Sequence, residues 1–244
     1  MIALMTITFV VCFVMGIPLA LVMGITGFAV ILAMGVPLQL VAQRMFTGID
    51  SFPLMAVPFF ILAGDLMNRG GTTVRIIGFA NSLVGHIRGG LAHACIVANM
   101  IFAGISGSAV ADASAIGSIM IPSMEKNGYD LDFSAALNSA AATIGPIIPP
   151  SIIMVIYGVS VNVSVGGLFA AGFIPGIMLG LAMMIVVSRV SRKKNYAMSE
   201  GFSGARVRKE LKSSVWALMA PVIILGGILG GVFTPTEAAA VAVI

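Results

Sequence analysis

The sequence predicts an all-α membrane protein that crosses the bilayer several times, and two observations support this prediction. Hydrophobic residues make up 59% of the 244 residues and charged residues only 9%, whereas about a quarter of the residues in a soluble domain are charged. Residues 1–43 and 133–188 contain no charged side chain, and one crossing helix needs about 20 apolar residues. These tracts also lack the two-residue alternation of transmembrane strands, so helices are the expected elements.

The length and order of the apolar tracts predict six crossings and one re-entrant hairpin. Residues 1–43 can hold two helices and residues 133–188 at least two, and further apolar tracts occupy the ranges 51–64, 89–111 and 213–236. The first tract is too long for a cleaved signal peptide, so we expect it to be retained as transmembrane helices.

The basic residues predict the orientation of the helices. The net charge is +4, and many of the basic residues crowd into one polar stretch in which only two glutamates oppose them. Such stretches stay on the cytoplasmic side of a membrane, so residues 189–214 are expected to form a cytoplasmic basic loop. The basic residues of this stretch are Arg189, Arg192, Lys193, Lys194, Arg206, Arg208, Lys209 and Lys212.

Two apolar tracts are interrupted where an ordinary transmembrane helix would be continuous. The first interruption is Gly-Ile-Ser-Gly-Ser at residues 104–108, where a helix that enters from the cytoplasm is expected to turn and to return as residues 109–124. The second interruption is at residues 144–151, where three prolines fall within five residues and remove donors that a regular helix needs. The sequence therefore predicts a re-entrant helical hairpin and a discontinuous helix.

A further helix is predicted to begin near the end of the sequence. Thr234 suits the N-cap, Pro235 the first helical position, and Glu237 the position that bonds back to the cap, which together are the signature of a capping box. Because the sequence stops about two helical turns later, we expect the 244 residues to be the front part of a longer protein.

The two interruptions predict a cation site, because unwound backbone inside a membrane leaves carbonyl and amide groups without helical partners. Oxygen atoms from two facing interruptions suit a hard cation such as sodium, and the helix N-terminus after the first interruption can face an anion. Hydroxyl groups add further oxygen ligands. The residues expected to bind the cation or a solute are Ser106, Gly107, Ser108, Asp112, Thr143, Gly145, Pro146, Pro149 and Pro150.

Polar side chains within the apolar helices allow more than one role. Asp112 lies one turn after Ser108, on the helical face that carries the turn. Its carboxylate can bond to backbone amides of the turn and stiffen it, or it can help to hold a cation. For Asn99 and Asn138, hydrogen bonds between helices are expected in preference to contacts with a ligand.

Other chemistries fit the sequence less well. The Gly-x-Ser-Gly pattern around Ser106 also occurs in rhomboid-type intramembrane serine proteases, but these enzymes need a histidine base on a later helix. Both histidines, His86 and His93, precede Ser106. Two histidines make a weak metal site, and Cys12 and Cys95 are expected to be packing residues. The sequence therefore predicts no cofactor and no enzymatic activity.

Three motifs closely resemble the large membrane subunit of TRAP (tripartite ATP-independent periplasmic) transporters of the C4-dicarboxylate type. They are Gly-Ile-Ser-Gly-Ser-Ala-Val-Ala-Asp at residues 104–112, the proline-rich segment 144–151, and the segment 233–240; the segment 59–71 is also similar. Each motif is short, but their order and spacing are specific, and the resemblance extends over the whole sequence.

The resemblance implies an elevator-type secondary transporter built from two inverted repeats, each with a re-entrant hairpin and a discontinuous helix. Ser106, Gly107 and Ser108 would form the tip of the inner hairpin, and residues 145–150 the unwound helix that faces it. The implied organisation is a first repeat at 1–188, divided into scaffold helices at 1–50, transport-domain helices with the hairpin at 51–157 and a following span at 165–188, then the basic loop at 189–214 and the truncated start of a second repeat at 215–244.

The resemblance also implies a function and partners. The protein would be a permease subunit of the bacterial inner membrane that imports organic acids, such as dicarboxylates or sialic acid, together with sodium ions. A small membrane subunit and a periplasmic substrate-binding protein would be its partners, and nucleic acid would not. Two alternatives stay open: a stand-alone ion-coupled organic anion symporter and, more remotely, an intramembrane serine protease. The substrate, the sodium stoichiometry and the oligomeric state are not specified.

Overall fold

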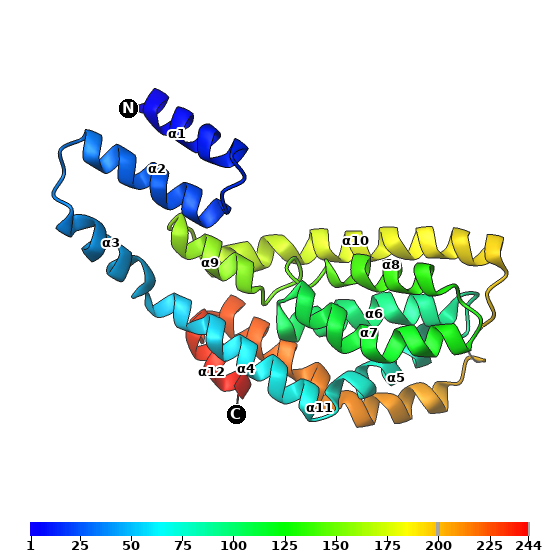
Figure 1. Ribbon diagram of the computed structural model, residues 1–244. Coiled ribbons are helices and arrows are strands. Elements are labelled where there is room, and N and C mark those ends of the chain that lie inside the picture. The colour runs from blue at the N-terminus through cyan, green and yellow to red at the C-terminus, as the bar shows by residue number, and fades with distance from the viewer. Residues whose placement is uncertain (199–200, 244) are drawn as a thin grey trace. The chain divides into compact units, whose positions relative to one another are not determined.

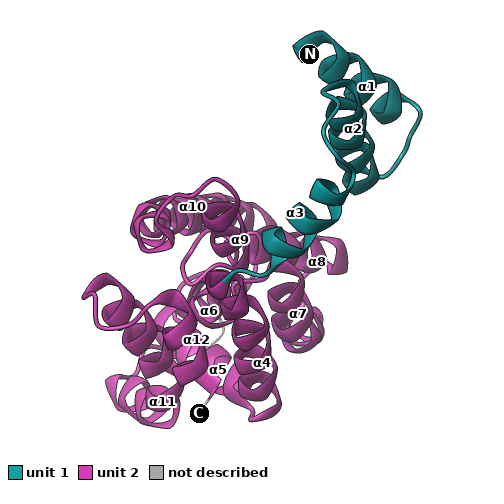
Figure 2. Ribbon diagram, turned by 90° about the vertical axis from the view of Figure 1, so that its left-hand side faces the viewer, with its two compact units in different colours: residues 1–51 teal, residues 52–244 magenta. Residues whose placement is uncertain are grey.

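The computed structural model describes residues 1–198 and 201–243, and within these ranges every named element is a helix (Figure 1). The chain forms two compact units (Figure 2). We call Met1–Ser51 the N-terminal unit and Phe52–Ile244 the main unit. The predicted all-helical fold is confirmed for the described residues.

The N-terminal unit consists of α1 (Ile2–Val14), α2 (Leu19–Ala33) and α3 (Gln39–Ile49), and α1 packs against α2. Gly16 and Gly35 follow the first two helices with φ angles of 75° and 68°, a left-handed conformation that glycine adopts without steric cost. These glycines divide the uncharged tract into helices of 13 and 15 residues.

Helix α6 lies at the centre of the main unit and contacts six other helices. Small residues line much of α6, so neighbouring backbones can approach it closely. In chain order the elements are η1 (Phe52–Met55), α4 (Ala56–Arg69), α5 (Thr72–Val84), α6 (Gly90–Ser106), α7 (Ala109–Lys126), α8 (Leu131–Ala142), α9 (Ile152–Ser160), α10 (Val165–Lys194), α11 (Gly204–Leu229) and α12 (Pro235–Val243).

Two apolar clusters hold the main unit together. The larger one centres on α6 and includes Ile96 and Phe102, which are almost completely buried. The smaller one joins α4, α9, α10, α11 and α12 and includes Phe60, Phe169 and Ile224. The long helix α10 contributes to both clusters, so it connects the α6 bundle with the end of the described chain.

Length and composition single out the helices that can each cross a membrane without a partner helix. In the described part of the chain, α10 with 30 residues and α11 with 26 are long and apolar enough, and a third crossing is possible if α3, η1 and α4 form one bent span. Helices α1, α2 and α6 are apolar but shorter. The six predicted crossings stay a prediction, because they include a broken helix, and glycines and prolines divide the apolar tracts into shorter elements.

The basic stretch 189–214 is mainly helical, although the sequence predicted a loop. Helix α10 continues to Lys194 and α11 begins at Gly204, because arginine and lysine are good helix formers and their charge is favourable at a helix C-terminus. Asn195 caps the C-terminus of α10, and its φ angle of 54° is left-handed. The described residues of the connection between the two helices are 195–198 and 201–203.

The predicted capping box at the start of α12 is confirmed. Thr234 N donates a hydrogen bond to Glu237 Oε2 at 2.8 Å, and Glu237 N donates to Thr234 Oγ1 at 3.3 Å. Two backbone donors at the start of the helix are thus satisfied reciprocally.

Candidate functional site

The first interruption is a two-residue turn between α6 and α7. Helix α6 ends at Ser106, Gly107 has a φ angle of 60°, and Ser108 is extended. Ser108 Oγ accepts a hydrogen bond from Ala111 N at 3.5 Å and so caps α7. Because α6 and α7 pack against each other, they form a helical hairpin; its re-entry into the membrane stays a prediction.

The second interruption separates α8 from α9. Helix α8 ends at Ala142 and α9 begins at Ile152, so the predicted break in this helix is present in the backbone. Ser151 Oγ donates a hydrogen bond to Pro146 O at 2.7 Å and accepts one from Met154 N at 3.3 Å. Ser151 therefore ties the unwound segment to the N-terminus of α9. In the sequence, this N-cap of α9 could be recognised as a serine that directly follows two prolines and precedes an apolar run.

The two interruptions lie against each other. A Cβ atom on Gly107 would be 2.6 Å from Pro150 O and 3.1 Å from Ile152 N, so the glycine allows the turn to touch the unwound backbone. A Cβ atom on Gly104 would be 3.7 Å from Pro149 O. The contact between distant segments places polar backbone from both interruptions in one region.

Asp112 joins the hairpin to the second interruption. It is completely buried, and its Oδ1 accepts a hydrogen bond from Ser106 Oγ. Its Oδ2 has no partner among the described residues and lies so near Gly145 that a Cβ atom on this glycine would collide with it. Ser108 N donates to Ser106 Oγ at 3.2 Å, so Asp112 is linked to the turn through the serine hydroxyl.

Backbone carbonyls are the most numerous free acceptors in this region. No described group donates a hydrogen bond to the carbonyls of Gly145, Ile147, Ile148, Pro149 and Pro150. Unpaired carbonyl groups in an apolar interior are unfavourable unless something binds them. Carbonyl and carboxylate oxygens are also the ligands that hard cations prefer.

The ends of four helices converge at this site. The C-termini of α6 and α8 place partial negative charge at the two interruptions, and the N-termini of α7 and α9 place partial positive charge there. Two broken helices whose ends meet in this way can bind a cation at their C-terminal carbonyl groups and a carboxylate at their N-terminal amide groups. The arrangement can therefore accommodate an ion and an anionic solute near each other.

Thr143 is the one predicted site residue that lies apart from this cluster. Its side chain is exposed, and its hydroxyl donates to Ala140 O at 2.6 Å. The other predicted residues lie on the turn, on the first turns of α7, or on the unwound segment. Pro146 is half-buried at the start of that segment, and its carbonyl oxygen accepts the hydrogen bond from the Ser151 hydroxyl.

The two asparagines contribute differently. Asn138 Nδ2 donates to Ala113 O at 2.9 Å and so links α8 to α7, which confirms the predicted bond between helices. Asn99 Nδ2 donates to Cys95 O within α6, and Asn99 Oδ1 has no partner among the described residues.

Broken helices whose ends meet inside an apolar helical bundle are typical of secondary transporters, and the comparisons with known proteins agree with this class. The family model described as "Tripartite ATP-independent periplasmic transporter, DctM component" matches residues 6–244. The chain belongs to this family.

Named relatives cover most of the chain. It is 48% identical over 211 residues to the sialic acid TRAP transporter large permease protein SiaM of Vibrio cholerae, which covers 86% of this chain and 49% of the relative. It is 44% identical over 245 residues to the C4-dicarboxylate TRAP transporter large permease protein DctM of the same species. This match covers 100% of the present chain and 54% of the relative. The sialic acid TRAP transporter permease protein SiaT of Haemophilus influenzae is 46% identical over 200 residues. This match covers 82% of the present chain and 32% of the relative. The chain thus spans about half the length, or less, of these relatives.

Proposed function

We propose that the chain is part of the large permease subunit of a sodium-coupled transporter that imports organic acids. The relatives named for sialic acid and for C4-dicarboxylates are permeases of anionic solutes, and the family supports a role in transport. The protein acts in the bacterial inner membrane with a small membrane subunit and a periplasmic binding protein.

The observation that carries the sodium proposal is the buried carboxylate of Asp112. One of its oxygens bonds Ser106, and the other has no partner among the described residues beside Gly145. A buried carboxylate that lacks a counter-charge is strongly unfavourable. A sodium ion that binds this oxygen and the free carbonyls of residues 145–150 neutralises the charge.

The coupling mechanism follows from this charge balance. Without sodium, the carboxylate and the free carbonyls disfavour movement of the site through the apolar part of the membrane. With sodium bound, the hairpin and the unwound segment form one neutral block that slides past a fixed scaffold, as in an elevator. Sodium thereby raises the population of the states that can cross the membrane. The size of this shift is set by how much more tightly sodium binds these states than the others.

The solute is expected to bind with its anionic group at the helix N-termini. The N-termini of α7 and α9 begin at the two interruptions, and their free amides attract a carboxylate. Since about half of each relative lies outside this chain, the remaining contacts are expected from the second repeat.

Sodium-dependent uptake by proteoliposomes tests this function. The complete permease, reconstituted with its small subunit and binding protein, is compared with the Asp112→Asn and Ser106→Ala variants. Asp112→Asn removes the charge that sodium would neutralise, so the sodium concentration for half-maximal uptake should rise at least about tenfold. Ser106→Ala should raise it by a smaller amount.

Asp132→Asn is the matched control, because Asp132 is an exposed acid in the first turn of α8. It should leave the sodium dependence unchanged. If Asp112→Asn also leaves it unchanged, the sodium site is not at this hairpin. Uptake without the binding protein would instead support a stand-alone symporter.

A further inference from the structure

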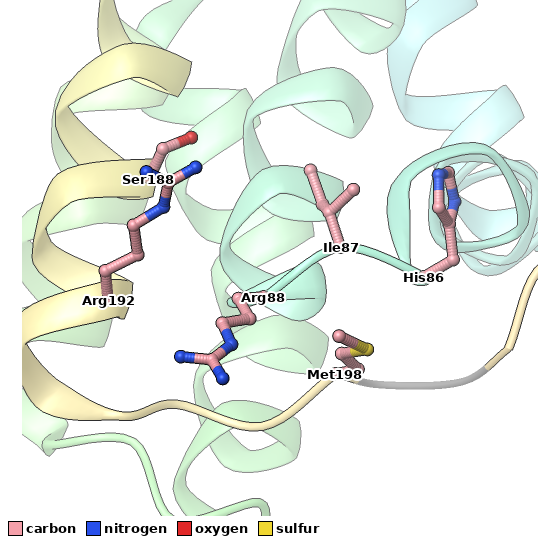
Figure 3. A pocket seen from close by; sticks show the side chains of 6 residues that line it. All are labelled: His86, Ile87, Arg88, Ser188, Arg192 and Met198. Atoms are coloured by element: carbon pink, nitrogen blue, oxygen red, sulfur yellow. The ribbon is translucent and has the colours of Figure 1, made fainter.

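A second polar region lies at the end of α10, away from the paired interruptions. It is a pocket of about 560 Å³ between the loop that follows α5, the last turns of α10 and the connection to α11 (Figure 3). The lining residues are His86, Ile87, Arg88, Ser188, Arg192 and Met198.

The pocket carries two positive charges that nothing in the described chain neutralises. Arg88 extends from the loop and Arg192 from α10 (Figure 3), and neither guanidinium has an ion pair or hydrogen bond with a described residue. No acidic residue is among those that line the pocket. The Ser188 hydroxyl lies on the same wall, 2.9 Å from His93 Nε2.

The loop that carries Arg88 is held in place by backbone contacts. Gly89 has a φ angle of 74°, and a Cβ atom at this position would collide with Ser191 Oγ. Gly89 N donates a hydrogen bond to Ala197 O at 3.2 Å, and Arg88 forms an isolated β-bridge with Met198. The backbone that carries Arg88 is therefore fixed against the residues that follow α10.

An apolar stripe on α10 continues from the pocket. Residues spaced by three or four positions share one face of a helix, and Ser188 and Arg192 follow such a series along α10. The preceding members are apolar and between 52% and 67% exposed. They are Ile174, Met178, Leu181 and Ile185.

We propose that this pocket binds the phosphate headgroup of an anionic phospholipid from the cytoplasmic leaflet, with the acyl chains along the α10 stripe. The basic end of α10 is expected on the cytoplasmic side, where basic pockets between helices bind anionic headgroups. The guanidinium groups suit a phosphate because they present paired donors. The apolar stripe selects a lipid over a soluble phosphate, because a small anion would leave it uncovered.

Native mass spectrometry of the complete permease tests this site. The protein is incubated with equal amounts of long-chain phosphatidylglycerol and phosphatidylcholine, and the bound lipids are counted. Wild type should retain phosphatidylglycerol in preference. The Arg88→Gln/Arg192→Gln variant should bind it roughly tenfold to thirtyfold more weakly, because each basic residue near a membrane surface contributes to attraction of anionic lipid.

The Arg189→Gln/Lys193→Gln variant is the matched control. It removes two exposed basic residues from the same end of α10 that do not line the pocket, and it should bind phosphatidylglycerol as wild type does. Equal weakening in both variants would show only general attraction and would overturn the site.

Three comparisons on the wild-type protein test the site without any variant. Equal retention of the two lipids would overturn the proposal. Displacement of phosphatidylglycerol by inorganic phosphate would assign the pocket to a soluble anion and would also overturn it. A short-chain phosphatidylglycerol should bind more weakly than the long-chain form, and equal binding would contradict the role of the α10 stripe.

Discussion

Helices α1 and α6 are both apolar, yet α1 has none of its 13 residues buried and α6 has 14 of its 17 buried. Their side chains differ in size more than in polarity. Most residues of α1 are large, whereas α6 is rich in alanine and glycine and includes the polar residues His93 and Asn99. Lipid tails are as apolar as leucine, so hydrophobicity alone does not bring helices together in a membrane. Small residues and polar groups therefore indicate the packed interior better than hydrophobicity does.

The largest expected effect comes from the left-handed glycine that follows α6. Gly107→Val adds a side chain to a left-handed residue and drives it into Pro150 O. The variant should lower the free energy of unfolding by about 2 to 5 kcal/mol, since backbone strain and overpacking add. Unfolding of the complete permease in detergent, followed by circular dichroism, measures the loss.

Gly35→Val is the control in the N-terminal unit. Gly35 has a similar φ angle of 68°, but no atom lies within 4 Å of a Cβ added there. Only the backbone strain of about 1–2 kcal/mol should remain. An equal loss in both variants would show that the contact between the two interruptions contributes nothing.

A smaller effect is expected when a large side chain is shortened inside α6. Phe102 is 1% exposed, and Phe102→Ala leaves a cavity in the larger apolar cluster. The loss should be about 2 to 3 kcal/mol, at or below the lower end for soluble proteins, because unfolded helices stay in lipid and only packing is lost. Thermal unfolding of the complete permease measures the loss.

Phe13→Ala provides the comparison for this change. Phe13 lies in α1 and is 58% exposed, so its replacement should leave stability almost unchanged. If Phe13→Ala were as destabilising as Phe102→Ala, then α1 would be packed as tightly as α6, and residue size would not separate the two regions.

Local signals in the sequence predicted the interruptions well. The turn at Gly107, the break before Ser151 and the capping box at Thr234 each depend on residues whose backbone preferences act within a few positions. All three features are present where the sequence placed them. Such features need no knowledge of the tertiary fold.

Features that depend on distant contacts were harder to predict. Thr143 is close in sequence to the break, but its hydroxyl bonds its own helix, since the face that a residue presents depends on packing. The contact of Gly107 with Pro150 joins residues 43 positions apart (150 − 107). The number of crossings stays a prediction, because hydropathy does not show where a helix ends.

The smallest expected effect is at the exposed base of the hairpin, where Asp130 follows α7. Asp130 Oδ2 accepts hydrogen bonds from Lys194 Nζ at 2.7 Å and Tyr196 OH at 2.8 Å. These two groups, Lys194 foremost, hold the pKa of Asp130 below its usual value of 3.8. Because the pKa is lower in the folded protein, the contact stabilises it above about that pH and is lost as the pH falls through the folded value.

Asp130→Asn should therefore lower the melting temperature slightly at neutral pH, and the difference from wild type should vanish in acid. Thermal unfolding of the complete permease in detergent, repeated at falling pH, measures this convergence. Asp65→Asn is the control, since Asp65 pairs with Arg69 at 2.9 Å within α4 and joins no separate segments. A constant difference for Asp130→Asn at every pH would mean that the ionised carboxylate does not hold α10 to the hairpin. The exposed contact should matter less than the buried one at Gly107, because solvent screens the charges of an exposed pair.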